Sequence, residues 1–132
     1  MKRSICLLFI IILTTLLYAS PPVNPFIGTW EGSIEGFDFN IVFMYDNMCI
    51  ITVKVVQDGR EITEETNGTY SYDDIYIRIN GTFNNSRIQG LGRINWYWPY
   101  AFVNNNNTTF RMRIIPPGSN SRTLVTFFRT FS

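Results

Sequence analysis

The chain contains no histidine among its 132 residues. Histidine is the commonest metal ligand in proteins and the side chain best suited to general-base catalysis near neutral pH. Its absence excludes imidazole-held haem, histidine-based zinc sites and nucleophiles activated by histidine. The sequence therefore argues against a metalloprotein and against the most common kinds of enzyme.

Long apolar runs are also missing, apart from one near the N-terminus. That run covers residues 5–17, about 13 residues, whereas a helix that spans a membrane needs about 20. Lys2 and Arg3 precede it and small residues follow it, which is the order of a secretory signal peptide. We expect cleavage after Ala19, so that residues 1–19 are removed. The prediction is an exported protein, periplasmic or extracellular, without a permanent membrane anchor.

Cysteine is nearly absent, since the chain has only Cys6 and Cys49. Cys6 lies within the predicted signal peptide, so Cys49 is the single cysteine of the mature chain. No intrachain disulfide can then form, and stability has to come from packing. Cys49 lies in an apolar stretch, where a buried and unreactive thiol is expected.

The chain has no surplus of either charge. Its 11 basic and 10 acidic residues become nine and ten when Lys2 and Arg3 are lost, which leaves a net charge of −1. This balance gives no reason to expect a nucleic acid or an anionic membrane as a partner. The residues that remain after position 19 are enough for one domain with one core.

A helical period is also lacking, because no segment after the signal peptide keeps one for about ten residues. The pattern has period two instead, with turns rich in Gly, Asn and Asp. Three prolines in residues 20–25 predict an extended lead-in. Asp58-Gly59 is the strongest hairpin signal. The expected strands span residues 26–34, 37–45, 48–57, 61–72, 75–83, 87–98, 108–115 and 122–131.

Eight strands in sequence, joined by short connections, predict an all-β fold for residues 26–132. The favoured architecture is an eight-stranded antiparallel up-and-down barrel, because closure leaves no exposed strand edge. A sandwich of two sheets is the alternative. Residues 99–107 are expected to be the longest irregular connection.

Three motifs resemble the small bacterial lipocalin-like proteins of the calycin group: Phe26-Ile27-Gly28-Thr29-Trp30, Gly68-Thr69-Tyr70 and Phe128-Arg129. The resemblance covers essentially all of residues 26–132 and implies a lipocalin-like barrel. It also implies that Trp30 packs inside the closed end and that Arg129 lies across its ring by cation–π attraction. A site is then expected at the opposite end, near residues 97–107. Haem-binding nitrobindins open similarly, but they hold iron through histidine, so that activity does not carry over.

The carboxylates offer no clear catalytic or metal-binding arrangement. Glu61, Glu64, Glu65, Asp73 and Asp74 lie at turns or at polar ends of the expected strands. We expect these side chains to be solvated, and their spacing does not match a calcium-binding loop. With histidine absent as well, we predict no catalytic residues, no metal, no cofactor and no enzymatic activity.

Aromatic residues are the most informative feature, because many of them fall on the expected inward face of the strands. Such rings either fill the core or line a cavity for a small hydrophobic molecule, and the sequence leaves both alternatives open. A ring-rich segment at residues 96–100 also suits a barrel rim or a partner-binding patch. The candidate ligand-binding residues are Phe39, Phe43, Tyr70, Tyr72, Arg93, Trp96 and Trp98.

The sequence thus predicts an exported, soluble barrel that binds a small hydrophobic ligand in its interior. One alternative is an envelope module that has a filled core and binds another protein. A second alternative is a small outer-membrane barrel, which would carry its apolar residues outward and its polar residues inward. The three differ in which strand face lies inside and in whether the interior has free space.

Overall fold

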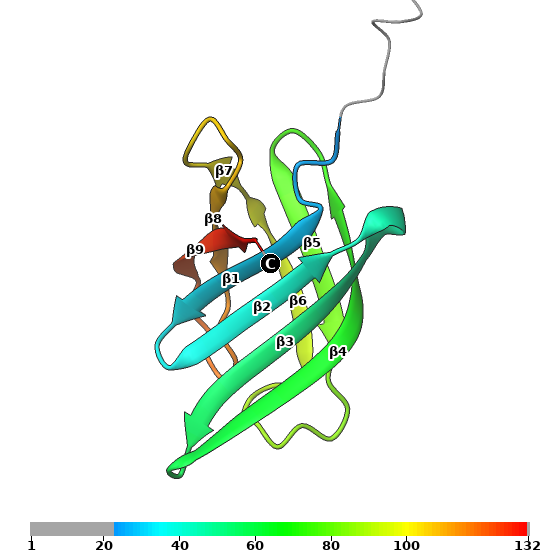
Figure 1. The fold of residues 1–132 in the computed structure, drawn as a ribbon. Helices are drawn as coiled ribbons and strands as arrows, with labels where there is room; N and C mark the ends of the chain where they lie inside the picture. Colours follow the sequence, from blue (N-terminus) through cyan, green and yellow to red (C-terminus); the bar gives the residue numbers. More distant parts are fainter. Residues whose placement is uncertain (1–22, 132) are drawn as a thin grey trace, which may run out of the picture.

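The computed structural model describes residues 23–131, so the predicted signal peptide and the first part of the lead-in lie outside the described residues. One antiparallel sheet curls into a nearly closed barrel (Figure 1). Among the described residues there is no helix long and apolar enough to cross a membrane. The strands are β1 (Gly28–Ile34), β2 (Phe37–Phe43), β3 (Met48–Gln57), β4 (Arg60–Tyr72), β5 (Tyr76–Thr82), β6 (Arg93–Pro99), β7 (Ala101–Phe102), β8 (Thr109–Ile114) and β9 (Thr123–Thr130).

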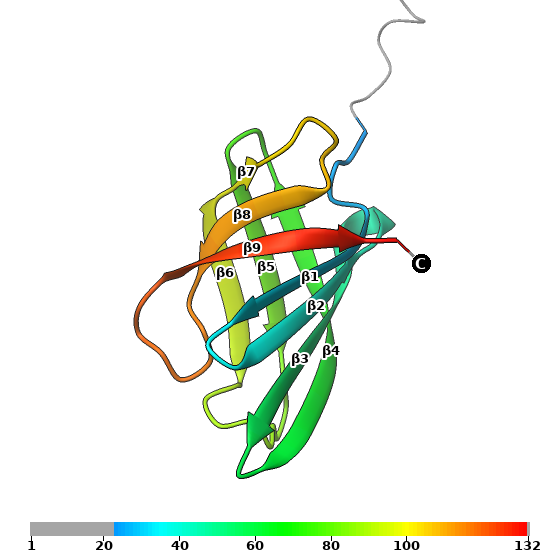
Figure 2. The ribbon, with the colours of Figure 1, turned by 60° about the vertical axis from the view of Figure 1, so that its left-hand side comes forward.

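The strand order follows the chain except where the first strand meets the last. The order across the sheet is β6-β5-β4-β3-β2-β1-β9-β8-β7, and every neighbouring pair is antiparallel. Figure 2 shows β8, β9, β1 and β2 side by side along one wall of the barrel. The two ends of the sheet, β6 and β7, are separated in the chain only by Tyr100. The bend at Tyr100 therefore brings the two ends of the sheet together.

The all-β class and the antiparallel barrel are confirmed, but the predicted count of eight strands is wrong. The ninth strand is β7, which lies in the expected irregular connection of residues 99–107 and pairs Ala101 with Arg111 and Phe102 with Phe110. It is too short to show a period-two pattern of its own. Its position depends on β8, a partner that local sequence does not specify.

The strand predicted for residues 87–98 begins later, at Arg93. Residues 83–92 form a loop in which Phe83, Ile88 and Leu91 are buried. The loop lies at the end of the barrel that also carries the turn between β3 and β4 (Figure 1), and its three apolar side chains belong to the core. Their spacing resembles a strand in the sequence, whereas in the structure they serve as a cover for the core.

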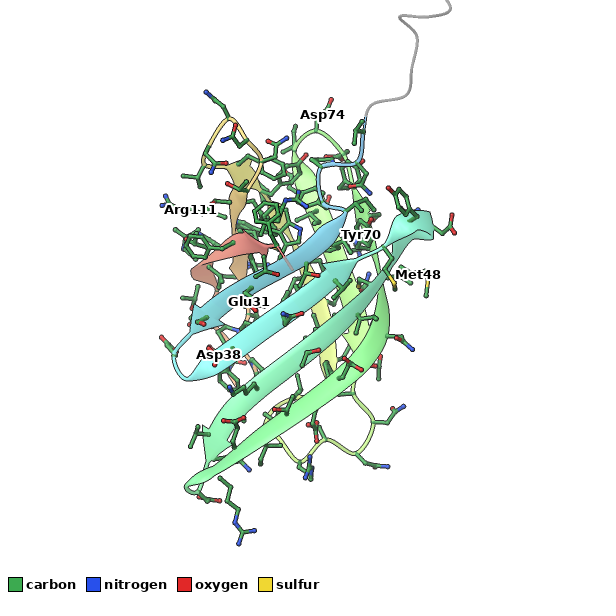
Figure 3. All side chains as sticks on the ribbon, viewed as in Figure 1. Glu31, Asp38, Met48, Tyr70, Asp74 and Arg111 are labelled. Atoms are coloured by element: carbon green, nitrogen blue, oxygen red, sulfur yellow. The ribbon has the colours of Figure 1, made fainter. Side chains whose placement is uncertain are left out.

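The interior is apolar, as the alternation of each strand predicts. On β2, Phe39, Ile41 and Phe43 are buried, while Asp38 on the same strand faces outward. No polar or charged residue among the described residues is buried. The outward faces instead carry the charged side chains, for example Glu31 and Asp38 in Figure 3.

Gly68 marks the closest approach between neighbouring strands in the interior. It lies on β4, opposite Cys49 of β3 and Gly81 of β5. A Cβ atom at Gly68 would come 2.1 Å from the carbonyl oxygen of Asn80, a backbone atom that cannot turn aside. A residue with a side chain would have to push β4 and β5 apart.

We expect Gly68→Ala to lower the free energy of unfolding by about 2 kcal/mol or more, the usual cost of overpacking a core. The matched control is Gly92→Ala, because a Cβ atom at Gly92 would meet nothing within 4 Å. Urea denaturation followed by circular dichroism measures both. Equal stability of the two variants would contradict the close approach at Gly68.

Candidate functional site

Trp30 and Arg129 lie against each other on β1 and β9. They are partners in the β1–β9 ladder, and the guanidinium carbon of Arg129 lies 4.3 Å from the centre of the Trp30 ring. Arg129 also donates hydrogen bonds to the carbonyl oxygens of Ile27 and Pro25. A Cβ atom at Gly28, where φ is +127°, would come 2.6 Å from this guanidinium. The glycine of the Gly-Thr-Trp motif thus leaves room for the arginine.

Phe26 fills the barrel directly beside this pair. The indole N–H of Trp30 donates to the carbonyl oxygen of Phe26 at 2.8 Å, and Phe26 itself is fully buried. Five aromatic rings surround Phe26 with centroid distances between 4.9 and 5.7 Å; they belong to Phe43, Tyr72, Tyr100, Phe102 and Phe110. This end of the barrel is therefore closed by packed rings.

Residues 97–107 do not form the opposite rim, so the expected placement of this segment is wrong. The rings of Phe102 and Trp30 lie 6.3 Å apart, and the carbonyl oxygen of Asn107 accepts a hydrogen bond from Arg129 at 3.3 Å. The segment lies at the Trp30 end because β7 pairs with β8, and β8 pairs with the strand that carries Arg129. The opposite end is covered by residues 83–92.

Four of the candidate ligand-binding residues are buried and contact one another. The rings of Phe43 and Tyr70 lie 4.6 Å apart, and those of Phe39 and Trp96 lie 5.1 Å apart at right angles. Edge-to-face contacts of this kind are favourable arrangements for aromatic side chains. The inward rings therefore occupy the interior as mutual partners.

The other three candidates take different positions. Tyr72 and Trp98 are half-buried and pack against the core from its margin. Arg93 is exposed on β6, on the outward side of the strand. Of the six aromatic candidates, Trp96 shares with Arg93 the lining of a hollow of about 290 Å³.

The polar atoms of the inward rings bond to the protein itself. The hydroxyl of Tyr70 donates to the carbonyl oxygen of Met44 at 2.7 Å and accepts from the amide of Asn24 at 2.8 Å. Burial raises the pKa of Tyr70, which keeps the hydroxyl protonated. The indole N–H of Trp96 donates to the carbonyl oxygen of Ile115 at 3.2 Å. Each of these polar groups therefore has a partner within the protein.

Glu64 is not a solvated carboxylate, contrary to expectation. It accepts hydrogen bonds from the hydroxyl of Ser86 and from the backbone N–H of Arg87, the latter at 2.7 Å. Only 15% of its side chain is exposed. The bond from Ser86, followed by those from Arg87, lowers the pKa of Glu64. Its role is structural, because its hydrogen bonds hold the loop of residues 83–92 at the end of the barrel that carries the β3–β4 turn.

The hollows on the described part of the chain lie at the surface or between strand edges. The rings of Trp30, Phe43, Tyr70 and Phe110 line none of the five that we find, whereas Phe39 and Trp96 each line one, of about 430 and 290 Å³. Two of the five, of about 290 and 210 Å³, lie between β6 and the segment that follows β8. No group of three or more Cys, Asp or Glu side chains in residues 23–131 could hold a metal ion.

The region between β6 and β8 is what the sequence reasoning missed. One signal for it is present in the sequence: residues 75–132 contain seven arginines and no Asp, Glu or Lys. The overall charge balance conceals this asymmetry. Which of the arginines lie together depends on how the barrel closes.

Comparisons with protein-family models, with curated proteins and with solved structures found no match for this chain. The class of protein is therefore defined by the structure alone, as a small, nearly closed antiparallel β-barrel with an apolar interior.

We expect Arg129→Lys to lower the free energy of unfolding by about 1–3 kcal/mol, because lysine keeps the charge but lacks the planar fork that bonds two carbonyl groups and stacks on Trp30. Arg111→Lys is the matched control, since Arg111 is exposed on β8 (Figure 3). Guanidinium denaturation followed by Trp fluorescence measures the difference. A loss as large in the control would contradict a special role for Arg129.

Cys49 is fully buried, and burial raises the pKa of its thiol to about 11 from 9.0. Since the folded state holds the proton more tightly, this group supports stability below pH 9 and loses that contribution as the pH rises through 11. We expect a thiol reagent to label Cys49 below pH 9 only after denaturation. Rapid labelling of the native protein would contradict this assignment.

Proposed function

We propose that this protein is an exported lipocalin-type barrel that works as a binding module, recognising another protein through its outer surface. The observation that carries the proposal is the packed interior, where aromatic rings contact one another and leave the surface as the place for recognition. The rings of Phe110 and Phe127 lie 5.0 Å apart, and the rings of Phe110 and Trp30 lie 4.7 Å apart.

The other two alternatives have less support. A carrier of small hydrophobic molecules needs an apolar cavity of a few hundred Å³ inside the barrel, and the rings of Trp30, Phe43, Tyr70 and Phe110 line none of the hollows described above. An outer-membrane barrel carries an apolar band on its outside. Here the apolar residues point inward, and charged residues such as Glu31, Asp38 and Arg111 point outward (Figure 3).

The distribution of charge also favours recognition by the surface. All ten acidic residues precede residue 75, with only Lys54 and Arg60 to oppose them after the expected signal peptide. The later part of the chain carries the seven arginines. Strands β1 to β4 therefore form an acidic half of the barrel, and β5 to β9 form a basic half. Such complementary fields give specificity and speed to protein association.

A panel of fatty acids, retinoids and other lipophiles tests the proposal against the carrier function. We expect no rise in melting temperature and no quenching of Trp fluorescence with any of them. Phe110→Ala is the positive control, because it opens a void beside Trp30 that a benzene-sized probe would fill. A lipophile that stabilises the unchanged protein as RT ln(1 + [L]/Kd) would overturn the proposal in favour of a carrier.

A selection from a random peptide library tests the binding function directly. We expect enriched peptides whose affinity for the protein falls when outward-facing charged residues are neutralised. The interior substitution Tyr70→Phe serves as the control, since it leaves the surface unchanged. Failure to enrich any such peptide would count against a protein-binding module.

A further inference from the structure

The barrel has an open seam between β6 and β8. Strand β7 pairs with β8, and β6 pairs with β5, but within residues 23–131 no backbone ladder joins β6 to β8. Extending the β7–β8 register into β6 would place Pro99 opposite Arg113 and Asn95 opposite Pro117. Both prolines would stand where the ladder requires an N–H, which proline lacks. The sequence therefore prevents the seam from closing along its length.

Backbone hydrogen-bonding groups face this seam from both sides. Directly after β6, the N–H of Tyr100 donates to Ile75 at 3.0 Å. By antiparallel alternation, Trp98 and Trp96 then direct their backbone groups to β5, while Tyr97 and Asn95 direct theirs to the seam. Some Cα atoms of β6 and β8 lie within 8 Å of each other, closer than the spacing of about 10 Å that a strand between them would need, so a ligand reaches the seam from its outer side.

On β8 the same alternation holds. The N–H of Arg129 donates to Thr108 at 2.8 Å, so Phe110 and Met112 direct their backbone groups to β9, and Arg113 directs its groups to the seam. The indole of Trp96 reaches Ile115 from the inner side and holds the two edges near each other. The indole of Trp96 therefore closes the inner side of the seam, and the outer side stays open.

Three arginines surround the hollow on the outer side of the seam. It has a volume of about 210 Å³ and is lined by Arg78, Asn95, Tyr97, Arg113, Ile115 and Arg122. Two of the arginines are held on rings: Arg78 lies 4.4 Å from the centre of Tyr97, and Arg122 lies 4.4 Å from that of Trp98. Their positions are therefore set before any ligand arrives.

No acidic group neutralises these arginines. Neither of the two ion pairs found in residues 23–131 includes Arg78, Arg113 or Arg122. The lining contains no carboxylate, and the strands on both sides of the seam come from the part of the chain without Asp or Glu. Guanidinium groups bind carboxylates through paired, charge-assisted hydrogen bonds.

We propose that the seam between β6 and β8 is the binding site for an acidic peptide segment in an extended conformation. Carboxylates of the peptide bind Arg78, Arg113 and Arg122 in the hollow on the outer side of the seam. This inference rests on the proposed function, because it names the partner class and the place on the surface.

A short acidic peptide fits the charge distribution better than a long polyanion. A nucleic acid would extend beyond the seam towards the acidic half formed by β1 to β4, where it is repelled.

The test uses a short synthetic peptide in which Thr and Glu alternate, titrated by fluorescence anisotropy against the full mature protein. We expect saturable binding that weakens with added salt. We also expect about a tenfold or greater loss of affinity in Arg113→Gln and in Arg78→Gln. Arg60→Gln, at the tip of the β3–β4 hairpin, removes the same charge far from the seam and should bind normally. Thermal unfolding establishes that all variants are folded.

Three control ligands separate the contributions. A peptide with Lys in place of Glu should not bind. Equal affinity for inorganic phosphate would overturn the peptide proposal in favour of a small-anion site. Tighter binding of a DNA oligonucleotide through the same arginines would overturn it as well.

Self-association is the remaining outcome. If light scattering shows a dimer that Arg113→Gln dissociates, the seam binds the acidic half of a second copy, and the peptide proposal fails. If peptides selected from the random library bind equally well to Arg113→Gln and Arg78→Gln, the seam proposal fails while the wider binding function stands.

Discussion

The stacking of Arg129 on Trp30 is the contact on which the closure of this barrel depends. The ladder between the first and last strands has only three residue pairs, so side chains carry much of the connection. Arg129 contributes to the connection between β1 and β9 by covering the indole of Trp30 and by donating hydrogen bonds to the carbonyl groups of Ile27 and Pro25. The bonded carbonyls lie just before β1, which fixes Phe26 in the barrel and sets the ring cluster around it.

That cluster also limits what the interior can do. Aromatic residues make up 16% of the chain, and many of them are buried in the core. In a barrel of this size, inward rings that contact one another leave little volume for a guest. Charge is divided between the two halves of the outer surface, and three arginines line a hollow beside β6.

Local patterns predicted much of the fold. The bounds of β3 and the hairpin turn at Asp58-Gly59 agree with the sequence prediction, because both depend on neighbouring residues, and Asp58 and Gly59 adopt the positive φ angles that such a turn requires. The short strand β7 and the loop at residues 83–92 could not be predicted from local sequence patterns. Their conformations depend on distant partners, namely Arg111 on β8 for Ala101 and Glu64 on β4 for Arg87.

By itself, the sequence determined the all-β class, the inward face of each strand and the absence of histidine chemistry, since alternation and composition are properties of residues close in the chain. Only the tertiary structure decided that residues 97–107 lie at the Trp30 end, that inward rings contact one another in the interior, and that Arg78, Arg113 and Arg122 line one hollow. The physical reason is that closure joins segments about a hundred residues apart. Which edges meet, and which are left open by a proline, follows from the whole sheet.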